Sequence, residues 1–173
     1  MTPTRRPALL VALGLVVALL FPLFIGTAAA DARTSTERSI ANAVTALLNS
    51  ERQANHLRAL RTDVRLISSA RSHNLAMARR NTMAHQLRGE SALGRRLDRA
   101  GYRWTQDGEN IGYKNRLTTA AALALQKAMY HERAPYNGHR LNILNKHFRH
   151  VGVDVYLDRA HHKIWLTVDF GNK

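Results

Sequence analysis

Apolar residues first recur at helical spacing, starting near residue 40. In the first stripe they lie one to four residues apart, which predicts an amphipathic helix with one buried face: Ile40, Val44, Leu47 and Leu48. After a corner at residues 56–57, a second stripe with the same periodicity predicts another helix: Leu66, Ala70, His73 and Met77. The first half of the chain is therefore expected to supply two helices to one core.

Two further helices are predicted from residues that typically begin or end a helix. Residues Ser91–Ala100 are followed by Gly101, and glycine commonly ends a helix. Residues Leu117–Arg133 have Thr118 as a candidate cap, and the pattern stops before Pro135 because a residue that precedes proline disfavours the helical conformation. We therefore predict a third, shorter helix and a fourth, longer one.

The spacing changes to alternation in the last part of the chain. Residues 151–156 and 164–169 alternate apolar side chains with other types, and residues 158–162 between them are typical of a hairpin loop. Asn110–Tyr113 is a shorter candidate strand. Helices that mostly precede a small antiparallel sheet, without a strand-helix-strand rhythm, favour an α+β domain over a dinucleotide-binding fold.

Residues 1–30 have the order of parts of a secretion signal. Arg5 and Arg6 precede an uncharged apolar run from Ala8 to Ile25, and small residues follow. The run is close to the roughly 18 residues that begin to span a membrane, so an uncleaved anchor is the alternative. We predict a signal peptide at 1–30, a polar linker at 31–38, with Ser35 or Thr36 as the cap of the first helix, and one domain at 39–173.

The composition of the chain limits the kinds of binding partner that this domain is expected to have. The chain has no cysteine, so no disulfide can stabilise it, although export would permit one. The net charge of +14 falls to +12 without Arg5 and Arg6, and such a charge favours anionic envelope components or lipid headgroups without choosing among them. Because no zinc-finger spacing, ribonucleoprotein motif or aromatic-interleaved basic run is present, we expect no specific nucleic-acid partner. Membrane attachment is expected only if the N-terminal segment stays uncleaved, and the sequence does not indicate an oligomeric state.

Four polar side chains could carry chemistry. Glu132 falls three residues after Met129 on the stripe of the fourth helix, which predicts an inward-facing carboxylate that needs a partner. His139 follows that helix after a turn, Glu109 stands at the start of the first candidate strand, and His85 precedes the third helix. Sequence spacing alone does not bring the four side chains together.

Short motifs between residues 43 and 171 support a family resemblance. They are Leu47-Leu48-Asn49-Ser50-Glu51-Arg52, Met83-Ala84-His85, Gly108-Glu109-Asn110-Ile111, Gly138-His139-Arg140 with Asn142-Ile143-Leu144, Val151-Gly152-Val153 and Asp169-Phe170-Gly171. Each motif is weak alone. In this order, over about three quarters of the chain, they resemble the CAP superfamily of cysteine-rich secretory, antigen-5 and pathogenesis-related proteins, and its bacterial branch in particular.

This resemblance implies a three-layer α/β/α sandwich with a small antiparallel sheet. It also implies a cleft lined by His85, His139, Glu109 and Glu132. In some family members the two histidines hold zinc or another divalent cation, while the acids bind solvent or act as acid or base. Activities ascribed to the family include sterol and fatty-acid binding, roles at cell surfaces, and proteolysis. Two departures weaken the assignment of Glu132: Met129 stands where many relatives have tryptophan, and many bacterial relatives lack the glutamate.

The four side chains permit three interpretations. Two neutral imidazoles supply half of the four ligands of a structural zinc site, so water or a bound molecule would complete an open site. A metal-bound water with a glutamate base could hydrolyse a peptide or ester, although the chain has no His-Glu-x-x-His helix and no Gly-x-Ser-x-Gly elbow. Alternatively, the four residues form a charge-paired network that only ties the chain together.

We therefore expect a secreted or envelope protein that binds a ligand, with divalent metal, in the cleft of the two histidines. A metal-dependent hydrolase is one alternative, and a lipid or sterol carrier that uses a groove between helices is the other. Among the remaining histidines, His73 is expected to be a packed core residue, and His161 and His162 are expected to be exposed in the hairpin loop.

Overall fold

The computed structural model describes Met1 and residues 33–173, and residues 33–173 lie within one compact unit. The elements are α2 (Ser35–Gln53), β1 (Arg61–Thr62), α3 (Val64–Arg80), α4 (Leu93–Arg99), β2 (Gln106–Lys114), α5 (Thr119–Tyr130), α6 (Gly138–Ile143), β3 (His150–Asp158) and β4 (Lys163–Asn172). The predicted secretion signal or anchor lies outside the described residues. Within the described part of the chain, no helix is both long and apolar enough to cross a membrane.

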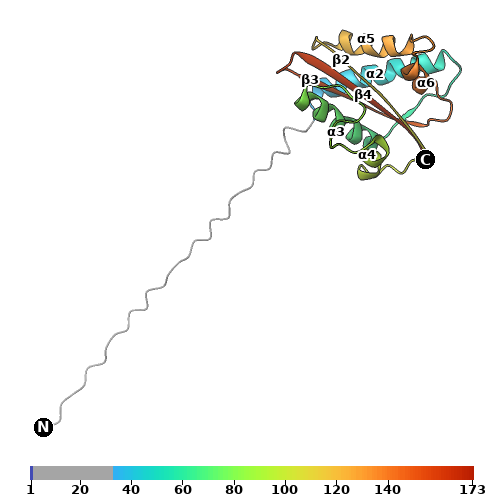
Figure 1. The fold of residues 1–173 in the computed structure, drawn as a ribbon. Helices are drawn as coiled ribbons and strands as arrows, with labels where there is room; N and C mark the ends of the chain where they lie inside the picture. Colours follow the sequence, from blue (N-terminus) through green and yellow to red (C-terminus); the bar gives the residue numbers. More distant parts are fainter. Residues whose placement is uncertain (2–32) are drawn as a thin grey trace. The chain divides into compact units, whose positions relative to one another are not determined.

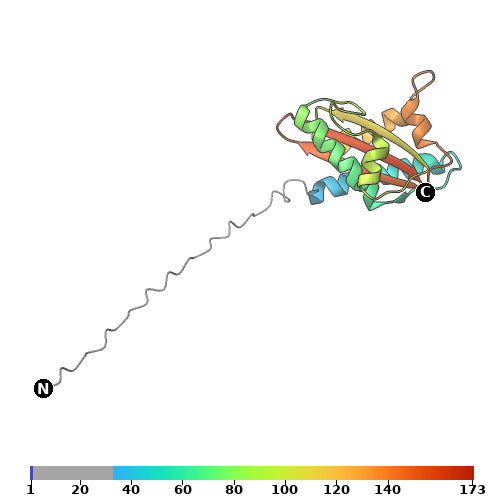
Figure 2. The same ribbon diagram turned by 60° about the horizontal axis from the view of Figure 1, so that its bottom comes forward.

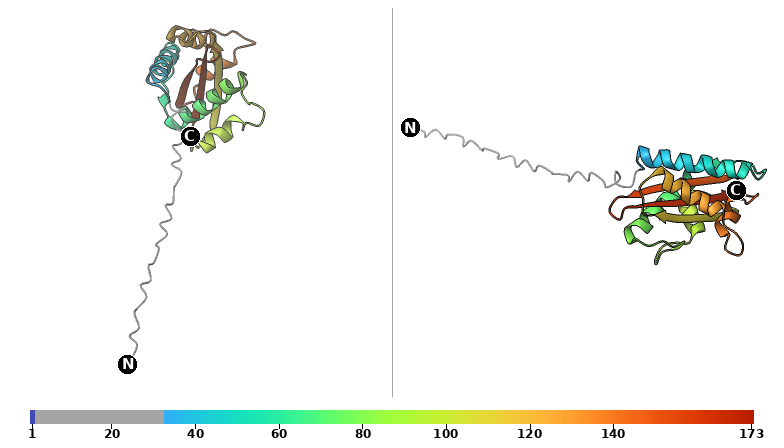
Figure 3. Two further views of the ribbon diagram at one scale, coloured as in Figure 1. Left: turned by 90° about the vertical axis from the view of Figure 1, so that its left-hand side faces the viewer. Right: turned by 90° about the horizontal axis from the view of Figure 1, so that it is seen from above.

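The strands form one sheet in the order β1, β3, β4, β2 (Figure 1). Helices α2 and α5 cover one face, and α3 and α4 cover the other, which the end-on view in Figure 3 shows as three layers. In the turned view of Figure 2, α3 and α4 lie in front of the strands. The α+β class and the three-layer sandwich are therefore confirmed.

The sheet differs from the prediction in one strand. β4 pairs antiparallel with both β2 and β3, as expected, but β1 pairs parallel with β3, so the sheet is mixed. β1 has only two residues, and a segment of that length carries no alternation by which a sequence pattern could reveal it.

The two faces of the sheet differ in chemistry. On the face of α2 and α5, alternate residues of β3 and β4 join a continuous apolar core: Val151, Val153, Val155, Ile164, Leu166, Val168 and Phe170. On the opposite face, buried polar side chains lie beside two smaller apolar clusters. Asn74 of α3 donates to the Asp154 carboxylate and accepts a hydrogen bond from Thr167. Asp169 is also fully buried there, next to Glu109 across the β2 and β4 pair.

Gly152 brings α3 close to this polar face. A Cβ atom at Gly152 would lie 2.2 Å from the backbone carbon of Leu66 and 2.3 Å from the backbone nitrogen of Ile67. Non-bonded contacts this short are essentially never seen for a Cβ atom, so only glycine permits the observed approach of α3 to β3.

The first helix begins earlier than predicted. It starts at Ser35, within the segment 31–38 that the sequence assigns to a linker, and its cap is Thr34 rather than Ser35 or Thr36. The Thr34 hydroxyl accepts from the backbone N–H of Glu37, and the Glu37 carboxylate accepts from the backbone N–H of Thr34. This reciprocal pair satisfies two N–H groups at the helix start and fixes where the helix begins.

The fourth predicted helix is shorter than the pattern suggests. α5 begins after its cap Thr118, as predicted, but it ends at Tyr130 and not at Arg133. The Arg140 guanidinium donates to the carbonyl oxygen of Tyr130, one of the last carbonyls that the helix leaves without an internal partner. Glu132 therefore lies in the loop that follows the helix.

Candidate functional site in a histidine and glutamate cleft

The four predicted side chains line one open cavity of about 630 Å³. His85 comes from the connection between α3 and α4, Glu109 from β2, Glu132 from the loop after α5, and His139 from α6. The sandwich thus brings together residues that are spread over more than fifty positions of the sequence. The remaining lining residues are Tyr136, Gly138, Leu141 and Asn142.

His85 and Glu109 form the first pair. The His85 ring donates from Nδ1 to Glu109 Oε1 at 2.9 Å, and the Arg96 guanidinium donates from Nη2 to Glu109 Oε2 at 2.5 Å. The Glu109 side chain is 3% exposed, whereas that of His85 is 61% exposed. Burial alone would raise the pKa of Glu109, but the hydrogen bond from His85 and the nearby charges of Arg96 and His73 outweigh it and lower the pKa. Glu109 is therefore a buried anion whose exposed partner faces the cleft.

His139 and Glu132 form the second pair. Glu132 Oε1 accepts from His139 Nδ1 at 2.5 Å, and Glu132 Oε2 accepts from the backbone N–H of His139 at 3.0 Å. The prediction that Glu132 faces inward from a helix stripe is wrong, because the helix has already ended and the carboxylate is 23% exposed. Its position is set instead by these two hydrogen bonds to α6.

Two asparagines join the pairs to each other. Asn110 donates from its side chain to the backbone carbonyl of His139 at 3.0 Å. Asn142 donates to the Asn110 side-chain oxygen at 2.9 Å and to the Glu109 backbone carbonyl at 3.2 Å. These side chains therefore link β2 to α6, and Asn142 also lines the cleft.

This pairing determines which ring nitrogens are available. In both rings Nδ1 is engaged by a carboxylate, so Nε2 of His85 and of His139 has no hydrogen-bond partner among the described residues. A carboxylate on Nδ1 orients an imidazole and directs the Nε2 lone pair outward, as in metal sites where a carboxylate holds a histidine ligand. All four carboxylate oxygens of Glu109 and Glu132 accept a hydrogen bond.

The donor set suits at most a weakly held cation. In the part of the chain that the structure describes, no three or more His, Cys, Asp or Glu side chains are grouped to hold a metal ion. Two Nε2 atoms would provide two ligands, and solvent or a bound molecule would have to complete the usual four.

Sequence reasoning missed the residues behind Glu109. His73 is fully buried, as predicted, but it also donates to Glu90 at 2.8 Å from Nδ1, and its Nε2 lies 3.8 Å from Glu109 Oε2. Burial and the charge of Glu109 raise the pKa of Asp169 well above its usual range. One signal could have identified Arg96: it lies three residues after Leu93, close to the apolar stripe of its helix.

The hairpin-loop histidines lie where the sequence places them. His161 and His162 are both exposed, and His161 donates from Nδ1 to Asp158 at 2.8 Å.

Apolar side chains surround the cleft. A second hollow of about 380 Å³ shares Glu132 and His139 with the cleft and is otherwise lined by Met83, Ile111, Gly112, Tyr113, Leu125, Ala128 and Met129. Four large hydrophobic side chains that are exposed line one or the other of the two hollows: Met83, Tyr113, Tyr136 and Leu141. Exposed apolar groups gathered next to convergent polar groups are typical of a ligand site.

Comparisons with known proteins agree with this architecture. The family model of the cysteine-rich secretory protein family, CAP, matches residues 45–170. No curated protein sequence matches the chain significantly.

Solved structures of bacterial proteins share the fold. An extracellular protein containing an SCP domain from Bacillus anthracis is 26% identical with a TM-score of 0.68, over 82% of this chain and 45% of that protein. A cysteine-rich secretory protein from Staphylococcus aureus is 20% identical with a TM-score of 0.57, over 82% of this chain and 40% of that one. An outer surface protein from Borrelia burgdorferi is 13% identical with a TM-score of 0.68, over 79% of this chain and 94% of that one. The last two show the fold alone, and the chain spans less than half the length of the first two.

Proposed function

Because the chain belongs to the CAP family of cysteine-rich secretory proteins, we propose that it is an extracellular or cell-envelope binding module that holds a ligand in the cleft of the two histidines. One observation carries the proposal: His85 and His139 are each oriented through Nδ1 by a glutamate and face one solvent-reachable cavity. The extracellular, surface and secretory descriptions of the structural relatives support the location.

The ligand has a polar part and an apolar part. Its polar group is recognised by the two Nε2 atoms, either directly or through a divalent cation that they hold. Such a cation would act as a Lewis acid toward the ligand's oxygen atoms. The apolar part lies on the side chains that continue from the cleft, such as Tyr113 and Met129.

Hydrolysis by a glutamate base has less support. A general base needs a lone pair directed at the proton that it removes. Here Glu109 is almost fully buried, and each glutamate holds Nδ1 of a histidine, so we assign both glutamates as positioning residues for the histidines.

Calorimetric titration with zinc chloride tests the cation. The exported protein is expected to release or absorb heat that a His85→Ala/His139→Ala variant lacks. His147→Ala is the matched control, because His147 is exposed and does not line the cleft. Equal heats from all three proteins would contradict metal binding at the cleft.

A lipid carrier is the second candidate, and the apolar hollow beside the cleft favours it. Ala128 is exposed on α5 and lines that hollow, whereas Ala124, one turn earlier, is exposed and does not. We expect Ala128→Glu, but not Ala124→Glu, to reduce extraction of a fluorescent fatty acid from vesicles, because it places a carboxylate in the apolar hollow. Absence of extraction by the unmodified protein would remove this candidate.

A further inference from the structure

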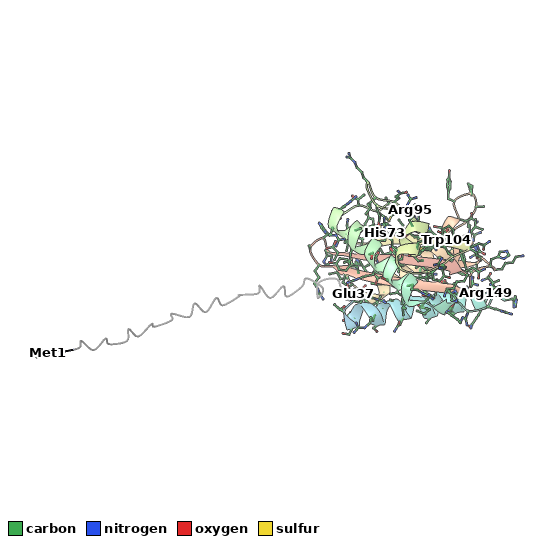
Figure 4. The ribbon with its side chains drawn as sticks, turned by 90° about the horizontal axis from the view of Figure 1, so that it is seen from below. Met1, Glu37, His73, Arg95, Trp104 and Arg149 are labelled. Atoms are coloured by element: carbon green, nitrogen blue, oxygen red, sulfur yellow. The ribbon has the colours of Figure 1, made fainter. Side chains whose placement is uncertain are left out.

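A separate pocket lies between α3 and α4, on the polar side of the sheet. It has a volume of about 290 Å³ and shares no lining residue with the cleft. Figure 4 shows this side of the molecule, with His73 of α3 and Arg95 of α4 labelled. The pocket is lined by Ser68, Ser69, Ser72, Glu90, Arg96, Arg99 and Ala100.

Buried donors without partners belong to a residue that lines this pocket. Arg96 is 7% exposed and Ser69 is 3% exposed. Nε and Nη1 of Arg96 have no hydrogen-bond partner anywhere in residues 33–173. Because nearly all buried polar atoms in native proteins are hydrogen-bonded, donors of this kind indicate a partner other than the chain itself.

The charge of the lining favours an anion. The lining residues carry two guanidinium groups, three hydroxyls and one carboxylate, that of Glu90, and one guanidinium, that of Arg96, is also paired with Glu109 outside the lining. Both Glu90 oxygens are already engaged, Oε1 by His73 Nδ1 at 2.8 Å and Oε2 by the backbone N–H of Leu87 at 3.1 Å. The groups that remain are therefore mainly hydrogen-bond donors, and two of them are positively charged.

We propose that the pocket between α3 and α4 is a second binding site, for a small oxyanion such as a phosphate group. A guanidinium presents several N–H groups in a fixed plane that matches the oxygens of phosphate, and hydroxyls can donate to the remaining oxygens. Arg96 and Ser69 form the buried part of the site, and Arg99, Ser68 and Ser72 form its exposed rim.

This site is connected to the cleft through one side chain. Arg96 uses Nη2 to hold Glu109, which in turn holds His85, and it also lines the pocket, with its Nε and Nη1 unpartnered. An oxyanion in the pocket fixes the plane of the same guanidinium that positions Glu109. The inference does not rest on a ligand in the cleft, because the unpartnered donors belong to a residue that lines the pocket behind it.

Calorimetric titration with inorganic phosphate, at constant ionic strength set with sodium chloride, tests the proposal. We expect saturable binding to the exported protein and about tenfold weaker binding to Arg99→Gln, since a hydrogen bond to a charged group contributes this much. Arg95→Gln is the matched control: it removes the same charge from an exposed position of the same helix that does not line the pocket. It is expected to bind phosphate as the unmodified protein does.

The control separates a site from general attraction to a basic protein. Equal weakening by Arg99→Gln and Arg95→Gln, or no saturable heat at all, would overturn the proposal. Circular dichroism verifies that each variant is folded. Glycerol phosphate serves as a second ligand: tighter binding than inorganic phosphate indicates a phosphate ester as the source, and weaker binding indicates the free anion.

Discussion

Removing Arg96 should show how strongly the cleft depends on the layer behind it. The Arg96 and Glu109 side chains are 6% and 3% exposed, and their charged atoms are 2.5 Å apart. In Arg96→Met the buried Glu109 carboxylate keeps only its hydrogen bond from His85, together with the more distant His73. Breaking a buried ion pair by removing one partner typically costs about 3 to 5 kcal/mol of unfolding free energy.

We expect Arg96→Met to lose about 4 kcal/mol, which for a domain of this size lowers Tm by on the order of 10 to 20 °C. Glu109→Gln in the same protein removes the uncompensated charge while its side-chain oxygen can still accept from His85. The double variant should therefore recover part of the loss, with a coupling free energy of about 1 to 3 kcal/mol.

Urea unfolding of the four proteins, followed by circular dichroism, measures this cycle. Arg95→Met provides the comparison on the exposed side of α4 and should change stability by less than about 0.5 kcal/mol. Losses that simply add, or an Arg96→Met variant within about 1 kcal/mol of the unmodified protein, would refute the view that a buried pair supports His85.

Two further predictions concern the polar face of the sheet. Burial raises the pKa of Asp154 to about 6, above its value in the unfolded chain, so this group stabilises the fold at acidic pH and that stability is lost as pH rises from about 4 to about 6. Urea unfolding across this range should show Asp154→Asn gaining about 3 kcal/mol relative to the unmodified protein, and a difference that is constant with pH would contradict the assignment. Gly152→Ala should lose about 3 kcal/mol or more in thermal unfolding, because its Cβ meets the backbone of α3. Gly138→Ala, where a Cβ meets open space, should change little, and similar losses in both would argue against the close approach.

Much of the fold could be predicted because its larger elements have a clear period. The helices after Thr34, Asp63 and Thr118 each combine a capping side chain with an apolar stripe, and the long strands alternate. β1 and α6 could not be predicted, since two and six residues are too short to show periodicity. The predicted end of α5 was wrong by three residues, and the last helical carbonyl, that of Tyr130, is bonded by Arg140, a contact that the helix's own sequence does not show.

The sequence predicted which residues form the candidate site, but not how their side chains are arranged. Sequence patterns and the family resemblance select His85, Glu109, Glu132 and His139, and these four line one cavity. The pairing of each glutamate with its histidine depends on the conformations of the connecting loops, which no local sequence pattern predicts. Glu132 is the clearest case, because a helical stripe predicted it to face inward, whereas hydrogen bonds to His139 place it at the rim.

The polar layer under α3 explains both what the sequence concealed and why the site needs it. Alternating polar residues in a strand normally indicate a solvent-facing side, so Asp154 and Asp169 resemble surface residues in the sequence. Here α3 covers them with Asn74 and Ser69, and a buried polar network results. Such a network is stable only if its members keep fixed positions, because each unpaired buried charge is costly. Glu109 belongs to this network and also orients His85. Because the buried Glu109 side chain has a fixed position, its hydrogen bond fixes the orientation of the His85 imidazole, although that ring is largely exposed.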